Sequence, residues 1–385
     1  METFEIEPFP LYWRLRSETD SASPVPELYP FIFSKDSDGL LVQARDPKLL
    51  SVLNDVYSLD YNIGYIQEGY GIAEPYLSDF WQYLERTVAT HGKNLRILEV
   101  GCGGALLLDR LRGLGHSVVG IDPSPLSERA SKALGIEIHK SMLAEGMDIG
   151  TFDLIFSMDV LEHAFDPHSF LTISADYLRD DGIVVTSVPD AGPSIELNDL
   201  SCAMHQHLQY FSDESLASLL RGAGFLNILV EKSSYGGSLY ATAARKESLW
   251  WGTSSSRAAD SRPAGGLDFE KLRVNLRAVA EHLTGLLDQH GSLGIYAPLR
   301  ALPYLSELEQ GFTDSRIRFI DDTGRWHRRF FDGSSIAIEN FEDVRRSPPG
   351  HIAVFSLTFE EALLGKISAA GLGANVSTLR EVIGP

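Results

Sequence analysis

The stretch Leu-Arg-Ile-Leu-Glu-Val-Gly-Cys-Gly-Gly, residues 95–104, decides the fold. Its first six residues are mostly apolar and predict a buried strand, and the glycines that follow predict a sharp turn into a helix. Because glycine has no Cβ, the backbone of such a turn can pass close to a ligand. The stretch therefore indicates the start of a series of βαβ units with a ligand site at the first turn.

Further strand candidates follow the turn and are separated by helical stretches of suitable length. They lie at residues 117–121, 136–139, 152–157, 182–188 and 227–232. Strands that alternate with helices imply a mostly parallel sheet covered by helices on both faces. The expected fold class is α/β, with a Rossmann-like core and an edge strand near residues 238–243.

Composition divides the 385 residues into four parts. Residues 1–75 are rich in Pro, Tyr and acidic groups, with helical character only near residues 47–56, and predict an N-terminal appendage that closes over a substrate. Residues 76–245 hold the α/β core. Residues 246–267 have the polar, small composition of a linker. Residues 268–385 predict a long helix followed by a small α/β domain of their own.

Charge and cysteine content limit the possible partners. The chain carries 53 acidic and 33 basic residues, a formal net charge of -20, which opposes binding to a nucleic-acid backbone. Two cysteines cannot build a disulfide framework or a four-thiolate zinc module. No signal peptide or long apolar run is evident, so we expect a cytoplasmic protein that does not enter a membrane.

The residues after the glycine turn indicate the kind of ligand. Asp122 ends the next strand, where its carboxylate can accept both hydroxyls of a ribose. Dinucleotide-binding folds use the same arrangement, but here the third glycine of their fingerprint is replaced by Leu106. Glu99 adds negative charge, which suits a cationic ligand and opposes a pyrophosphate. A tight turn without any ligand remains an alternative.

Five segments together resemble the Rossmann-like class I methyltransferases: ILEVGCGG, VVGIDPS, FDLIFSMDVLEH, DGIVVTSVPD and SLLRGAGF. The resemblance implies S-adenosylmethionine as cofactor and S-adenosylhomocysteine as product. The glycine turn would line the methionine end, Asp122 the ribose, and the Ser141 region the adenine, although many relatives carry Asp where this chain has Ser141. The expected cofactor-binding set is Glu99, Gly101, Cys102, Gly103, Asp122, Pro123, Ser141, Met142 and Ser157.

Histidines are the candidate proton acceptors, because the unperturbed pKa of histidine suits a base near neutrality. His205 and His207 lie in one segment, and in the similar sugar C-methyltransferases the corresponding histidine is the proposed base, which favours His207. His163 follows the strand that carries Ser157 and is a third candidate. A structural role is open for each of them. Cys202 with these histidines lacks a fourth zinc ligand, so no metal is expected.

The aromatic cluster Tyr61, Tyr65 and Tyr70 is the candidate acceptor surface, with core packing as the alternative. Over its whole length the chain resembles deoxysugar C-methyltransferases, which implies a nucleotide-linked sugar as acceptor, although their cysteine-rich module is absent. C- and O-methylation both fit. An O- or N-methyltransferase of another metabolite, and an inactive methyltransferase fold used for binding, remain alternatives. The C-terminal domain is expected to bind the acceptor or to form a homodimer.

Overall fold

The computed structural model describes residues 2–11, 15–18, 20, 26–36, 40–44, 46–58, 73–246, 267–373 and 375–384. The contacts divide the chain into two compact units. The central unit consists of Arg45–Asp190 and Leu208–Ala264. The terminal unit consists of Met1–Ala44, Ala191–His207 and Gly265–Pro385. The N-terminal segment therefore folds with the C-terminal domain, an association that the linear order of the four predicted parts did not include.

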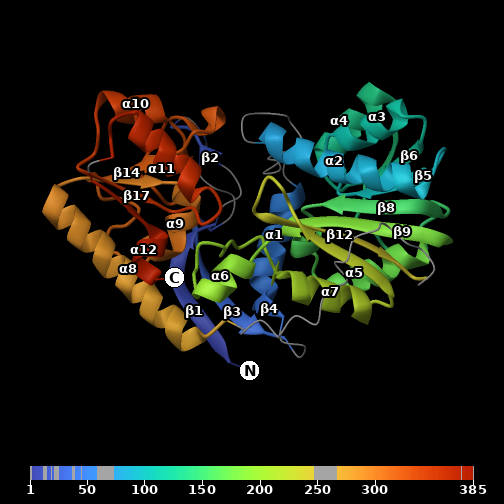
Figure 1. Ribbon diagram of the computed structural model, residues 1–385, viewed down its shortest axis with the longest axis horizontal. Coiled ribbons are helices and arrows are strands. Elements are labelled where there is room, and N and C mark those ends of the chain that lie inside the picture. The colour runs from blue at the N-terminus through green and yellow to red at the C-terminus, as the bar shows by residue number, and fades with distance from the viewer. Residues whose placement is uncertain are drawn as a thin grey trace. The chain divides into compact units, whose positions relative to one another are not determined.

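A seven-stranded sheet forms the centre of the central unit, in the order β11-β12-β9-β8-β5-β6-β7 (Figure 1). The five strands from β9 to β7 are parallel, whereas β11 and β12 form an antiparallel hairpin against β9. This confirms the predicted α/β class. The strands are β5 (Arg96–Val100), β6 (Ser117–Ile121), β7 (Glu137–His139), β8 (Phe152–Met158), β9 (Leu178–Pro189), β11 (Asn227–Lys232) and β12 (Ser238–Ala244).

Helices cover both faces of this sheet (Figure 1). The apolar sides of α2, α3 and α4 share one core with side chains such as Ile97 and Phe156 from the sheet. The helices α5 and α7 pack together and against β9, β11 and β12. The helices of the unit are α1 (Pro47–Ser58), α2 (Ala73–His91), α3 (Leu106–Gly113), α4 (Pro125–Leu134), α5 (Pro167–Asp176) and α7 (Asp213–Gly222), with the short strand β10 (Gln209–Tyr210).

The last strand of the sheet is not at its edge, contrary to the sequence-based expectation. All seven residues of β12 are buried, and the strand lies between β9 and β11. The tight turn at Gly236 and Gly237, both with positive φ, folds the β11–β12 hairpin so that β11 becomes the edge. The partly exposed residues of β11 fit this edge position.

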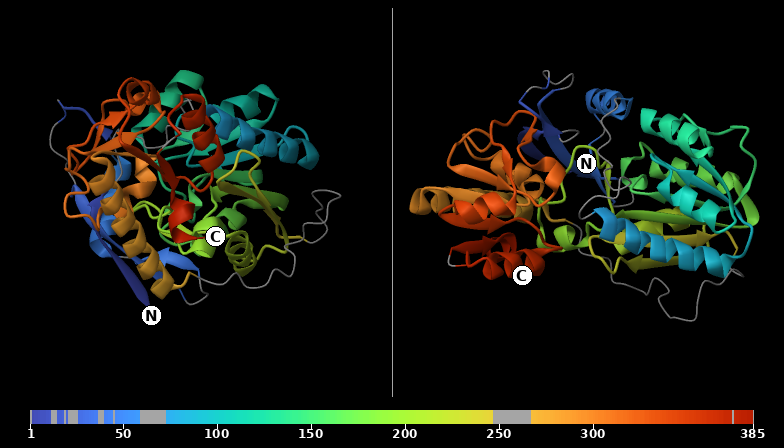
Figure 2. Two further views of the ribbon diagram at one scale, coloured as in Figure 1. Left: turned by 60° about the vertical axis from the view of Figure 1, so that its left-hand side comes forward. Right: turned by 90° about the horizontal axis from the view of Figure 1, so that it is seen from above.

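The C-terminal part of the terminal unit is a second α/β fold. Its parallel sheet has the order β16-β14-β13-β17-β18, with β13 (Leu293–Tyr296), β14 (Ile317–Ile320), β16 (Ile338–Glu339), β17 (His351–Val354) and β18 (Val376–Thr378). Figure 2 shows the long helix α8 beside this sheet. The helices are α8 (Phe269–His290), α9 (Pro298–Leu305), α10 (Phe341–Arg346), α11 (Glu360–Ala369) and α12 (Leu379–Ile383).

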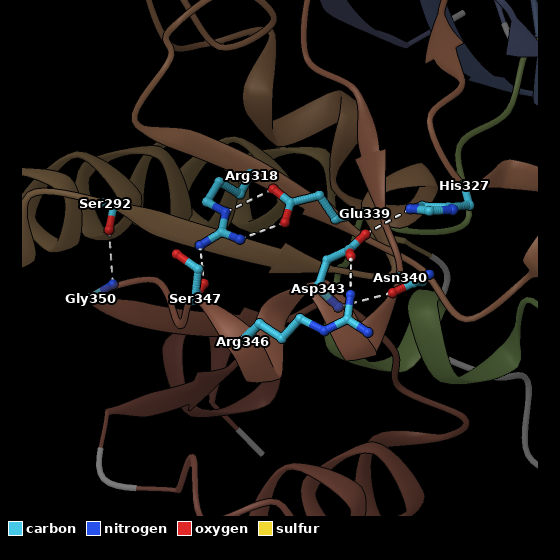
Figure 3. A network of polar contacts seen from close by, with 9 residues as sticks. All are labelled: Ser292, Arg318, His327, Glu339, Asn340, Asp343, Arg346, Ser347 and Gly350. Atoms are coloured by element: carbon cyan, nitrogen blue, oxygen red, sulfur yellow. Dashed lines mark hydrogen bonds and ion pairs between the residues drawn. The ribbon is translucent and has the colours of Figure 1, made fainter.

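Ion pairs within this second fold use most of the charged groups near α10 (Figure 3). Arg318 on β14 forms two hydrogen bonds with the Glu339 carboxylate on β16, at 2.7 and 2.5 Å. His327 contacts the Asp343 carboxylate at 2.6 Å. Asn340 caps α10 through its side chain. The charges of Arg318 and Glu339 neutralise each other and link β14 to β16, and the contact of His327 with Asp343 fastens α10.

Strands also form near the N-terminus, where the sequence predicted only an appendage. In the terminal unit β1 (Thr3–Pro10) pairs antiparallel with β3 (Leu28–Lys35), and β3 pairs with β4 (Leu41–Gln43). A further short strand, β2 (Leu15–Arg16), pairs with β15 (Phe330–Phe331) of the C-terminal fold. Alternation of buried and exposed residues from Thr3 to Ile6 is the pattern of a half-buried strand.

The segment Ala191–His207, which includes α6 (Gly192–Leu197), is fastened to the C-terminal fold by Asp199. This carboxylate is fully buried and accepts hydrogen bonds from Ser194 Oγ at 2.8 Å, from Ser201 and from the Tyr304 hydroxyl at 2.5 Å. The Tyr304 hydroxyl also accepts the Leu200 N–H at 2.8 Å. The tyrosine therefore satisfies two buried groups of the segment. No helix in the described part of the chain is long and apolar enough to cross a membrane.

We predict that Tyr304→Phe lowers the free energy of unfolding by about 1 to 3 kcal/mol, since it leaves a buried donor and acceptor without their partner. Urea denaturation measures this loss. Tyr177→Phe is the matched control, because its hydroxyl also has two partners, the Ala144 carbonyl and the Met147 N–H, but at a more exposed site. Equal losses in the two variants would show that the Asp199 contacts do not fasten this segment.

Candidate functional site

The glycine turn after β5 is built so that only glycine fits. Gly101 has φ 77°, and a Cβ placed on it would lie 2.4 Å from Cγ2 of Val160. The Gly101 N–H donates to the Ile121 carbonyl at 2.7 Å. Gly103 also has a positive φ, of 43°. The backbone is therefore held between the ends of β6 and β8, where the carboxyl ends of the parallel strands meet.

Asp122 follows β6 and lies beside this turn, as the sequence predicted. One carboxylate oxygen accepts the Gly103 N–H at 2.8 Å, and the other accepts the Ser124 N–H at 2.8 Å. The residue is only 8% exposed. These bonds fix the orientation of the carboxylate and leave it lone pairs for the donors of a ligand.

Glu99 lies within β5 and is almost fully buried. Its Oε2 has no hydrogen-bond partner among the described residues. Burial and the neighbouring Asp122 raise the pKa of Glu99 well above its usual value. A buried carboxyl oxygen without a partner is costly, and a cationic or hydrogen-bonding ligand offers it one.

Only the backbone of Cys102 belongs to the site, and its side chain does not. Its thiol is fully buried in the core, where a Cβ on Gly120 would lie 2.7 Å from the sulfur. Burial raises the pKa of this thiol, so it stays protonated and unreactive. The thiol therefore packs the turn against β6.

The other predicted cofactor residues lie in different surroundings. Pro123 is half-buried beside Asp122, and Met142 is 60% exposed. The Ser141 hydroxyl is buried without a hydrogen-bond partner among the described residues. Ser157 lies inside β8, where its hydroxyl contacts the Thr186 hydroxyl of β9 at 3.1 Å. Its hydroxyl therefore takes part in packing between strands.

Asp159, which the sequence reasoning did not select, follows β8 at the same edge of the sheet. Its carboxylate accepts the Tyr76 hydroxyl at 2.8 and 3.0 Å and the Ser187 hydroxyl at 3.3 Å. The Tyr76 hydroxyl in turn accepts a hydrogen bond from Ser238 at 2.9 Å. Asp159 to His163 belong to one of the five segments that carry the family resemblance. Nothing in the sequence indicated that Tyr76 contacts Asp159.

Glu162 and His163 form the short helical turn after Asp159. The Glu162 side chain is 2% exposed, and neither of its oxygens has a hydrogen-bond partner among the described residues. His163 Nε2 lies 3.7 Å from Glu162 Oε1, and this histidine side chain is 23% exposed. Carboxylate and imidazole are also metal-ligand types, so these two residues could hold a cation.

His207 remains a candidate base because the residue that follows it in the chain contacts the segment of Glu162 and His163. The next residue, Leu208, donates its N–H to the Glu162 carbonyl at 2.8 Å. The His207 N–H donates to the Met204 carbonyl at 2.9 Å, and its side chain is partly exposed. Its catalytic role stays a prediction, as does that of His163.

His205 has the environment of a core side chain. It is 1% exposed, its Nε2 contacts the Tyr29 carbonyl at 2.9 Å, and its ring lies 4.3 Å from the Phe9 ring centroid. Burial lowers the pKa of His205 to about 4. These contacts favour the structural alternative for this residue. No metal-ligand group containing Cys202 or His205 forms in the described part of the chain.

The candidate acceptor residues Tyr61, Tyr65 and Tyr70 lie outside the described residues. Their role therefore stays a prediction.

Comparison with known families identifies the core. Residues 73–230, from the start of α2 into β11, match the family described as a methyltransferase domain. This region is a methyltransferase domain. Its glycine turn, Asp122 and Glu99 all lie within the matched residues.

Curated relatives of the methyltransferase domain include ubiquinone biosynthesis O-methyltransferases. A ubiquinone biosynthesis O-methyltransferase of Dinoroseobacter shibae is 32% identical over 149 residues, which are 34% of this chain and 60% of the relative. One of Rhizobium johnstonii is 37% identical over 99 residues, which are 24% of this chain and 40% of the relative. The chain thus spans 40 to 60% of the length of these relatives.

Solved structures similar to the chain include a possible histamine N-methyltransferase from Thermotoga maritima, with 19% identity and a TM-score of 0.35, covering 44% of this chain and 92% of that one. Another is the N-methyltransferase NodS from Bradyrhizobium japonicum, with 18% identity and a TM-score of 0.35, covering 44% and 96%.

The buried His205 predicts a specific pH dependence of stability. The pKa of His205 is about 4 in the folded chain and near 6.5 when unfolded, so unfolding takes up a proton between these values. The stability that the buried, neutral His205 contributes is therefore complete above about pH 6.5 and is lost as the pH falls to about 4.

We expect the free energy of unfolding to fall by roughly 2 to 3 kcal/mol more in wild type than in His205→Gln between pH 6.5 and 4. Urea denaturation across this range measures the difference. The surface variant His139→Gln is the control. Parallel pH profiles of wild type and His205→Gln would contradict a buried, neutral His205.

Proposed function

We propose that the methyltransferase domain transfers a methyl group from S-adenosylmethionine to a small-molecule acceptor, with a hydroxyl group as the first choice. The observation that carries the proposal is the arrangement at the carboxyl ends of β5 and β6, where a glycine turn lies between an oriented Asp122 and a buried Glu99 whose Oε2 has no hydrogen-bond partner among the described residues.

The residues at this edge fit the cofactor in three ways. Because a Cβ at Gly101 would collide with Val160, only bare backbone fits at this turn, and a methionine chain can lie against that backbone. The Asp122 carboxylate matches the two hydroxyls of a ribose. Glu99 Oε2 and the buried Ser141 hydroxyl have no hydrogen-bond partner among the described residues, and polar groups of the cofactor can supply one.

Each residue then has a defined task. The cofactor supplies a methyl group on a positively charged sulfur. The glycine turn and Asp122 would hold the cofactor, and fixing its orientation toward the acceptor is what a direct displacement requires. An acceptor hydroxyl must lose its proton as the new bond forms, and His207 accepts this proton, with His163 as the alternative base.

Oxygen as the acceptor atom is supported by the relatives named as O-methyltransferases. A nucleotide-linked sugar is the second candidate, favoured by the parallel β16-β14-β13-β17-β18 order, which is typical of nucleotide-binding sheets. Against it, the Tyr296 hydroxyl and Lys366 already bind Asp322 beyond β14, near the place of a ribose-binding acid. A panel of phenols and nucleotide sugars, with mass detection of a 14 Da gain, distinguishes the two classes.

Calorimetry tests the cofactor assignment without any acceptor. Asp122→Ala should weaken S-adenosylhomocysteine binding by about 1.5 to 3 kcal/mol, since a charge-assisted hydrogen bond is lost. Asp176→Ala, at the exposed end of α5, should leave the affinity unchanged. Unchanged affinity in folded Asp122→Ala, or no binding to wild type, would overturn the assignment.

For any acceptor that gains a methyl group, His207→Gln should reduce turnover by about 10²- to 10⁴-fold while cofactor affinity stays nearly intact. The variant should also lose the acidic limb of the pH profile, because glutamine cannot ionise. Comparable rates with the same acidic limb would assign the base elsewhere, and His163→Gln would then be tested in the same way.

A further inference from the structure

Asp159 lies at the carboxyl end of β8, beside the glycine turn that follows β5. It is the first residue after β8, and its N–H donates to the Ser187 carbonyl at 3.1 Å. Its φ of 53° is in the left-handed region, where aspartate and asparagine are the most tolerated residues after glycine. The next residue, Val160, packs on Gly101 so closely that no Cβ fits there. The geometry thus holds Asp159 beside the cofactor turn.

The partners of the Asp159 carboxylate are neutral. They are the hydroxyls of Tyr76 and Ser187, which donate hydrogen bonds to it and carry no charge. None of the ion pairs formed by the described residues of the central unit includes Asp159. Burial raises the pKa of Asp159 to about 6, which still leaves it mostly ionised at pH 7.5. The charge is therefore oriented but not neutralised.

A second carboxyl group strengthens this observation. Glu162, three residues further on, is 1% exposed and has no hydrogen-bond partner for either oxygen among the described residues. Burial and the nearby Asp159 raise the pKa of Glu162 well above its usual value. Together with Glu99 Oε2, three buried carboxyl oxygens here have no hydrogen-bond partner among the described residues.

The strand order determines which end of the cofactor approaches Asp159. The strands lie in the order β8-β5-β6, and their carboxyl ends share one edge. A cofactor whose ribose is held at Asp122, after β6, and whose methionine part crosses the glycine turn, after β5, extends toward β8 and Asp159. The positively charged sulfur and amino group belong to this methionine part.

We propose that Asp159 is a specificity-determining residue that makes the site distinguish S-adenosylmethionine from S-adenosylhomocysteine by charge. This inference rests on the proposed function. The two molecules differ by one methyl group and one positive charge at sulfur, so a fixed negative charge nearby stabilises the methyl donor more than the product. The product, which is neutral at sulfur, then leaves the site more readily.

Calorimetry on the full chain at pH 7.5 tests this inference with three probes: S-adenosylmethionine, S-adenosylhomocysteine and sinefungin. Sinefungin carries a charged amino group in place of the sulfonium. Asp159→Asn keeps the shape of the side chain and its tolerance for the left-handed backbone. It removes the charge and keeps one oxygen that can accept the Tyr76 hydroxyl. We expect the affinity for the two charged probes to fall on the order of tenfold more than the affinity for S-adenosylhomocysteine.

Asp153→Asn is the matched control, because Asp153 lies near the opposite end of the same strand, roughly 20 Å away at about 3.3 Å per residue. It should leave the ratio of the three affinities unchanged. Asp159→Glu, which retains the charge, should recover part of the preference. An equal loss for all three probes in folded Asp159→Asn, or no loss at all, would overturn the charge discrimination. Failure of wild type to bind any probe would instead overturn the proposed function.

Discussion

The close approach of Val160 to Gly101 is the contact on which the site depends. It joins the end of β8 to the turn after β5, and the hydrogen bond from Gly101 to the Ile121 carbonyl joins the same turn to β6. Three parallel strands are thus held together at the edge where their carboxyl ends meet. Because no side chain fits at Gly101, the main chain itself forms the surface that faces a ligand, and the Asp122 carboxylate is oriented by the same turn through Gly103.

Electrostatics then select the kind of ligand. Carboxyl groups accumulate at this edge, and the donors that orient Asp122 and Asp159 are backbone N–H groups and hydroxyls, which carry no charge. The buried Glu99 and Glu162 keep oxygens without hydrogen-bond partners among the described residues. A site of this kind opposes an anionic pyrophosphate and favours a ligand with positive charge, in agreement with the family match over residues 73–230.

The sequence predicted the features that depend on neighbouring residues. The run from Ile97 to Gly104 and the carboxylate at Asp122 were identified because strand, turn and acid follow one another in the chain. Contacts between distant residues were missed: nothing local indicates that Tyr76 bonds Asp159, or that the ring of His205 packs on Phe9. The N-terminal strand β1 was also missed, although its short alternation of apolar and polar residues was a usable signal. Tyr304 holding Asp199 explains why residues 191–207 fold with the C-terminal part, which no linear division predicts.

The central claim is that the cofactor lies across the carboxyl ends of β8, β5 and β6. Hydrogen–deuterium exchange of the full chain, with and without saturating S-adenosylhomocysteine, tests it most directly, because bound ligand protects the backbone that it covers. The account predicts slower exchange in three separate segments, residues 99–105, 122–127 and 157–163, with little change in the C-terminal sheet. Protection confined to the C-terminal sheet, or none in these three segments at saturation, would contradict it.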